Sequence, residues 1–315
     1  VFLSQASNGY GGSAALSYQD QGNDFPACGR WVVSQRAVAD GLGNTAKTAY
    51  AYQPAAAAGS WCGDEEYEFL GFGTATQTVY DLNSSSSVDH KVVTEFYQAD
   101  DARKGKEKKV QVKGPDDSLL QATQTDWATS GTWAYLYKTT ETSCGGGACQ
   151  SKETTYHYDT SMQGGVQYGN LTRIKEYDEH GALDRLTRRY FKARDELGAN
   201  PPETTVYMVD RSQSEYVWEA DSSDFDDLAS LTWYYYDGNN LVTDPLGDHG
   251  DLTRVQRLQF DGISEGYRWY DTSDLTYTYD NYGNRVSQAA YRGPGRVKQR
   301  DSDPWTVSWV SYPTE

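Results

Sequence analysis

One short pattern recurs along this sequence: a tyrosine, an aspartate directly after it, and a glycine that leads into an apolar or basic stretch. Two copies are compact, and in two looser copies the glycine comes late. The four copies are Tyr177, Asp178 and Gly181; Tyr279, Asp280 and Gly283; Tyr158, Asp159 and Gly169; and Tyr236, Asp237 and Gly250. Self-similarity of this kind indicates a repeated structural unit.

Each residue type of the repeat suits a turn between two strands. The tyrosine ends a strand against its neighbours, the aspartate accepts backbone N–H bonds, and the glycine takes a positive φ that other residues resist. The next strand then returns antiparallel. Further turn signals at 40–44, 113–117, 237–240 and 281–284 predict that successive strands are joined as hairpins.

The rest of the chain also favours strands. Short alternating runs recur, for example at 31–38, 91–97 and 132–137, and helical periodicity is hard to find. With 26 Tyr and 30 Gly, only 37% hydrophobic residues and a mean hydropathy of -0.78, the composition fits a thin sheet with wet faces. We expect a single all-β region over 1–315, with 221–230 as either a short helix or an irregular loop.

The segment Thr276–Val286 resembles the YD repeat of RHS proteins. Upstream blocks at 34–45, 66–74 and 94–106 are similar, in order, to the RHS-type shell of SpvB-like proteins and of the B component of bacterial insecticidal toxin complexes. The resemblance implies a continuous ribbon of long antiparallel β-hairpins that spirals into a hollow shell or part of one. Members are commonly longer than 315 residues, so the chain is expected to be a fragment.

In the toxin members such a shell encloses a cargo polypeptide, and in related wall-associated proteins and teneurins it serves surface contact. The resemblance therefore implies a secreted, non-enzymatic shell that encloses or displays a polypeptide cargo such as a toxin. The alternative is an extracellular or cell-surface adhesion or assembly scaffold, with glycan binding as one use. Expected partners are a polypeptide cargo, further segments of the same chain, copies of itself or other subunits.

The charge and the polar residues exclude several function classes. A net charge of -17 opposes binding to nucleic acid, and no apolar run is long enough for a membrane span. The histidines at 90, 157, 180 and 249 show no metal or triad spacing, so no catalytic, cofactor or metal residues are assigned. Acidic turns could hold Ca²⁺, but none matches an EF-hand loop.

One motif resembles part of the toxin family's self-cleaving core. Asp244-Pro245-Leu246-Gly247 is similar to the Asp-Pro-x-Gly turns of that core, whose chemistry needs paired aspartates. Its companion motif is absent, so a turn between strands is favoured and no protease is assigned.

The four cysteines, Cys28, Cys62, Cys144 and Cys149, are compatible with two disulfides in an oxidising compartment. Pairing of Cys28 with Cys62 and of Cys144 with Cys149 is the favoured arrangement of three. Free thiols and a zinc site are the weaker alternatives.

Two further stretches have a structural and a functional interpretation. The basic segment 103–109 is either a charged hairpin, which we favour, or a surface that docks an acidic partner. Aromatic runs at 233–236 and 269–270 either pack as cross-strand pairs, which we favour, or stack on sugars from an open face.

Overall fold

A computed structural model describes residues 2–20, 31–54, 72–98, 100, 102–131, 133–145, 147–160, 166–195, 207–219, 227–264, 267–300 and 303–311. The chain divides into two compact units, Val1–Glu153 and Thr154–Glu315. Each unit is a single sheet, and each is described here by itself. The expectation of one region over 1–315 stays a prediction.

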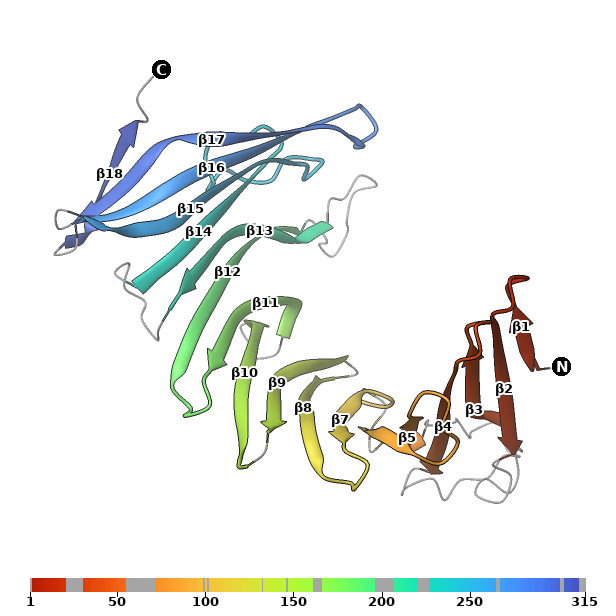
Figure 1. Cartoon of the computed structure of the whole chain (residues 1–315). Helices are drawn as coiled ribbons and strands as arrows, with labels where there is room; N and C mark the ends of the chain where they lie inside the picture. The colour runs from red at the N-terminus through yellow and green to blue at the C-terminus, as the bar shows by residue number, and fades with distance from the viewer. Residues whose placement is uncertain are drawn as a thin grey trace. The chain divides into compact units, whose positions relative to one another are not determined.

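The first unit is an antiparallel sheet in which each strand pairs with the strand before it in sequence (Figure 1). Its strands are β1 (Gln5–Ser7), β2 (Ser13–Asp20), β3 (Trp31–Ala39), β4 (Thr45–Pro54), β5 (Phe72–Tyr80), β6 (Val88–Phe96), β7 (Glu107–Lys113), β8 (Leu119–Ser130) and β9 (Trp133–Cys144). This order is a meander, which needs only short connections.

The second unit repeats the arrangement with longer strands, and every register from β11 to β18 is antiparallel. Its strands are β10 (Cys149–Thr160), which begins in the first unit, β11 (Val166–Tyr177), β12 (Leu183–Asp195), β13 (Tyr207–Trp218), β14 (Leu228–Tyr236), β15 (Leu252–Ser264), β16 (Tyr267–Tyr279), β17 (Arg285–Arg300) and β18 (Asp303–Ser311).

The expected all-β ribbon of antiparallel hairpins is confirmed, and the described ranges contain no α-helix. The segment 221–230, for which a short helix was one expectation, is only partly described. Its last residues, Leu228–Ser230, open strand β14. A helix is therefore wrong for that end of the segment, where Leu228 and Ser230 pair with β13 and Ser230 also pairs with β15.

Buried apolar side chains gather in the second unit. Leu186, Leu231, Leu258 and Tyr270 are at most 5% exposed and form one cluster with Trp218 and Leu228. In the described part of the first unit, by contrast, the buried hydrophobic residues are two alanines, Ala122 and Ala134. Its sheet therefore relies on half-buried residues and on the polar contacts between turns, as a thin polar sheet must.

Candidate functional site

The repeat turns are the best-defined polar sites of the molecule. In the compact copies the N–H of Gly181 donates to the carbonyl of Asp178 at 3.1 Å, and the N–H of Asp178 donates to the carbonyl of Ala182 at 2.9 Å. Gly181 has a φ of 79°. This is a type I turn followed by a left-handed glycine, a standard three-residue hairpin loop.

The aspartate side chain completes this turn. Oδ1 of Asp178 accepts the N–H groups of His180 and Ala182 at 2.9 and 2.8 Å. Oδ1 of Asp280 accepts those of Tyr282 and Asn284 at 2.8 and 2.9 Å. The hydrogen bond from Ala182, followed by that from His180, lowers the pKa of Asp178, because the bonds stabilise the charged carboxylate.

In the looser copies the aspartate again accepts backbone N–H bonds and the glycine again has a positive φ, but a longer loop separates them. Oδ1 of Asp159 accepts N–H bonds from Gly169 at 3.0 Å and from Asn170 at 3.1 Å. Asp237 accepts from Gly250 at 3.2 Å and from Asp251 at 2.9 Å. The late glycines again have positive φ, 85° at Gly169 and 63° at Gly250. The spacing between aspartate and glycine thus varies, and the glycine N–H donates to the aspartate backbone carbonyl in the compact copies and to the aspartate side chain in the looser ones.

The repeat tyrosines connect neighbouring strands. The hydroxyl of Tyr236 donates to the carbonyl of Ser212 on β13 at 2.9 Å, and that of Tyr279 donates to the carbonyl of Leu252 on β15 at 2.8 Å. Tyr177 ends β11 and Tyr158 lies near the end of β10. Burial raises the pKa of Tyr236 to about 12, since the phenolate would be desolvated.

The first unit contains two turns of the same geometry that are not among the four copies of the repeat. Asp40 accepts the N–H groups of Leu42 and Asn44 at 2.7 and 3.1 Å, and Asn8 accepts those of Tyr10 and Gly12 at 2.9 and 3.1 Å. Each is followed by a left-handed glycine three residues later. The sequence does contain an Asp or Asn followed by a glycine at this spacing in both turns. The tyrosine that marks the repeat is missing before Asn8 and before Asp40.

These turns contact one another at the ends of the strands. A Cβ on Gly41 would lie 2.7 Å from the carbonyl carbon of Gly11, so the two backbones approach as only glycine allows. The side chain of Asn83, from the β5–β6 turn, accepts the N–H of Thr45 at 2.7 Å. The turns of this unit therefore stabilise each other as well as their own hairpins.

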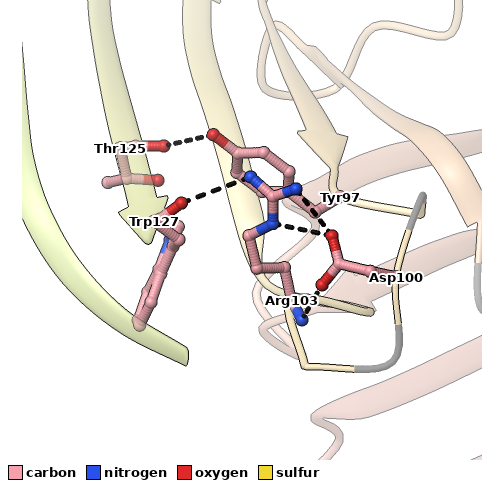
Figure 2. Close-up of polar contacts among 5 residues, drawn as sticks. All are labelled: Tyr97, Asp100, Arg103, Thr125 and Trp127. Carbon is pink, nitrogen blue, oxygen red and sulfur yellow. Dashed lines mark hydrogen bonds and ion pairs between the residues drawn. The ribbon is translucent and has the colours of Figure 1, made fainter. Parts of the chain in front are cut away.

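A second polar cluster holds the β6–β7 loop against β8 (Figure 2). Arg103 Nη2 lies 2.6 Å from Asp100, and its Nη1 donates to the carbonyl of Trp127 at 3.3 Å. The hydroxyl of Tyr97 donates to the carbonyl of Thr125 at 3.2 Å. The hydrogen bond from Arg103 lowers the pKa of Asp100. The first residue of the basic segment 103–109 thus makes contacts within the chain.

The aromatic runs and the Asp244 motif both pack within the second unit. Tyr235, Tyr236 and Tyr270 are 7%, 4% and 2% exposed, so their rings are not open to a sugar. The loop that carries Asp244 lies against β12, where Lys192 donates to the carbonyl of Asp244. Leu246 of that loop is buried with Met208 and Tyr236. The motif occupies a packed turn between β14 and β15.

The structure describes two of the four cysteines, and it gives contacts for some of the histidines. Cys144 and Cys149 form a disulfide at the β9–β10 turn, and Cys28 and Cys62 lie outside the described residues. His90 lies 2.8 Å from Asp89 and His180 lies 3.7 Å from Asp178. In the described part of the chain no group of three or more His, Cys, Asp or Glu residues is arranged to hold a metal ion.

One hollow on the second unit is open and polar. It has a volume of 780 Å³, and its walls include Arg185, Glu215, Glu219 and Arg257. Glu215 is already held by Arg189 at 2.6 Å. The hollow presents charges of both signs.

Comparisons with known proteins show a similar fold in solved structures. No family model and no curated protein matches the sequence. The chain is similar to a chain in the crystal structure of TcdB2-TccC3-Cdc42, with a TM-score of 0.60, 13% identity and coverage of 96% of this chain. For TcdB2-TccC3-TEV the values are 0.59, 12% and 97%. This chain spans 22% of the length of each.

Proposed function

We propose that this chain is a segment of a non-enzymatic β-sheet shell that encloses or displays a polypeptide cargo such as a toxin. The observation that carries the proposal is the uninterrupted pairing of strands in sequence order within each unit. Such a ribbon can extend without leaving internal edges, because each new hairpin covers the edge of the previous one. Likeness of fold to the TcdB2-TccC3 chains supports the same role.

Partners follow from the length of the chain. Since the similar chains are several times longer, further segments of the same polypeptide are the first partners that we propose, and a cargo polypeptide is the second. Closure of the sheet into a hollow shell is part of the proposal, with the missing surface supplied by those segments.

We propose a secreted location because two of the cysteines form a disulfide. The Cys144–Cys149 disulfide is stable in an oxidising compartment and is rarely kept in the cytosol. The described residues include no helix that is long and apolar enough to cross a membrane.

Protease protection tests the proposal. The full-length protein that contains this chain is digested with trypsin, first intact and then after mild urea has opened the sheet, and the fragments are identified by mass spectrometry. We expect a segment outside 1–315 to survive in the intact particle and to be cut once the sheet opens. If every such segment is cut equally fast in both states, nothing is enclosed and an open surface scaffold is the better account.

A further inference from the structure

Three pairs of cationic side chains lie directly opposite each other in the described strand registers. They are Lys91 and Lys113, Lys192 and Arg211, and Arg173 and Arg188. Directly opposed residues of antiparallel strands project from the same face with Cβ atoms about 5 Å apart, so like charges at such positions are destabilising.

Two of these pairs have an anionic neighbour. Lys91 lies 2.7 Å from a carboxylate oxygen of Asp117, and Arg211 lies 2.9 Å from one of Asp210. A carboxylate beside two cations offsets their repulsion. The neighbours come from the turns and strands of the same unit.

The third pair differs. Neither Arg173 on β11 nor Arg188 on β12 forms an ion pair with a carboxylate of the described residues, and the Nε of each is buried without a hydrogen-bond partner. Both residues are half-buried. The guanidinium of Arg188 lies over the ring of Trp218 at 5.5 Å, which fixes its plane against an apolar wall.

More positive charge surrounds this pair. Lys175 is two residues from Arg173 on the same strand, so the two share a face. Burial, followed by the charges of Arg173 and Lys175, lowers the pKa of His157 on β10. A chain with a net charge of -17 therefore gathers cations on two adjacent strands, β11 and β12.

We propose that Arg173 and Arg188 form a binding site for a carboxylate of an acidic polypeptide segment. A carboxylate between two guanidinium groups can accept an N–H from each, which is a strong and directional arrangement. It would also replace the repulsion between the two arginines with two attractions. The carboxylate comes from a segment other than the described residues.

The net charge of the chain favours a peptide carboxylate over a polyanion as the ligand of the two arginines. A chain of charge -17 repels nucleic acid or polyphosphate at long range, whereas a single carboxylate within a mixed peptide feels mainly the local cations. Tyr216 lies directly opposite Arg188, and its half-buried ring, which stacks on the buried Trp218 at 5.5 Å, offers apolar contact to the rest of a peptide. The inference rests on the proposed function only for the source of that peptide.

The test uses the whole chain and a fluorescent Gly-Ser peptide that carries one Glu, with binding followed by anisotropy. Arg173→Gln and Arg188→Gln are each expected to weaken binding about tenfold or more, since each removes a charged hydrogen bond. Arg185→Gln is the matched control, because it lies on the other face of β12, is paired with Glu176 at 3.7 Å, and should bind unchanged.

A second readout separates binding from folding. Without peptide, Arg173→Gln and Arg188→Gln should unfold at the same temperature as the parent or higher, because each relieves repulsion; a clear drop would mean that the pair is structural. Equal binding of the same peptide with Gln in place of Glu, or equal binding by all three variants, would overturn the site. Sulfate that displaces the peptide at equal concentration would reassign it to free anions. Each of these results leaves the protease-protection test of the shell unaffected.

Discussion

At the scale of single residues, the turn glycines are equivalent in backbone conformation and differ in surroundings. Gly250 and Gly283 both have positive φ, at 63° and 79°. A Cβ on Gly250 would lie 2.3 Å from the sulfur of Met208, whereas a Cβ on Gly283 would have nothing within 4 Å. The two positions therefore separate backbone strain from steric conflict.

Gly283→Ala is predicted to cost about 1 kcal/mol, the strain of a left-handed alanine. Gly250→Ala should cost on the order of 3 kcal/mol, because Met208 must also move within a packed cluster. Urea unfolding of the two variants measures both values. Equal losses would mean that the loop at Gly250 adapts and that the contact with Met208 is unimportant.

Tyr236→Phe is predicted to destabilise the protein by about 1 kcal/mol, because the carbonyl of Ser212 loses its buried hydrogen-bond donor. Tyr282→Phe is the control, since Tyr282 is 90% exposed. Thermal unfolding at neutral pH compares the two, and an equal effect would contradict a specific role for the Tyr236 hydroxyl.

The same residue predicts a pH dependence. Burial raises the pKa of Tyr236 to about 12, above the ordinary value of 10.0 in an unfolded chain. The unfolded chain therefore loses this proton first, and the stability due to Tyr236 is complete below pH 10 and is lost as pH rises towards 12. Stability measured from pH 9 to 12 should fall less steeply in Tyr236→Phe than in the parent.

At the scale of elements, the hairpin is the unit that the sequence predicts well. The turns at Asp178 and Asp280 could be predicted because the aspartate, its N–H donors and the glycine all lie within five residues. The Arg103 cluster could not, since its acceptor on Trp127 is 24 residues away. The opposition of Arg173 and Arg188 depends on strand register, which a one-residue slip would abolish.

The Cys144–Cys149 disulfide closes a short loop at the β9–β10 hairpin, with a sequence separation of 5. Loop-closure entropy for so short a loop predicts a stabilisation of about 2 kcal/mol. A Cys144→Ser/Cys149→Ser double variant should lose that amount in urea unfolding, against Ser143→Ala as the control. A loss near zero would mean that the turn is already ordered without the bond.

The Asp100–Arg103 contact holds the β6–β7 loop to β8, so Asp100→Asn is expected to loosen that loop alone. Amide hydrogen exchange should speed up at Arg103, Lys104 and Gly105, whose N–H groups are bonded within the loop. Asp89→Asn, whose side chain contacts only its neighbour His90 among the described residues, is the control. Faster exchange throughout the unit would show that the loop has a wider role.

At the scale of the whole molecule, we propose that sequence-ordered hairpins build a shell wall. Two kinds of contact link the hairpins of the described residues: turns that contact each other at strand ends, as Gly11 and Gly41 do in the first unit, and tyrosines of the second unit that donate to the backbone of the adjacent strand. Both kinds link neighbours only, so the ribbon can lengthen without a thicker core. The central proposal is that the sheet surrounds another polypeptide segment.

A cryo-EM map of the full-length protein that contains this chain tests that claim most directly. The account predicts that residues 1–315 form part of a wall around density from another polypeptide segment, with acidic side chains near Arg173 and Arg188. A map in which both faces of the sheet meet solvent, with no polypeptide density on either, would contradict it.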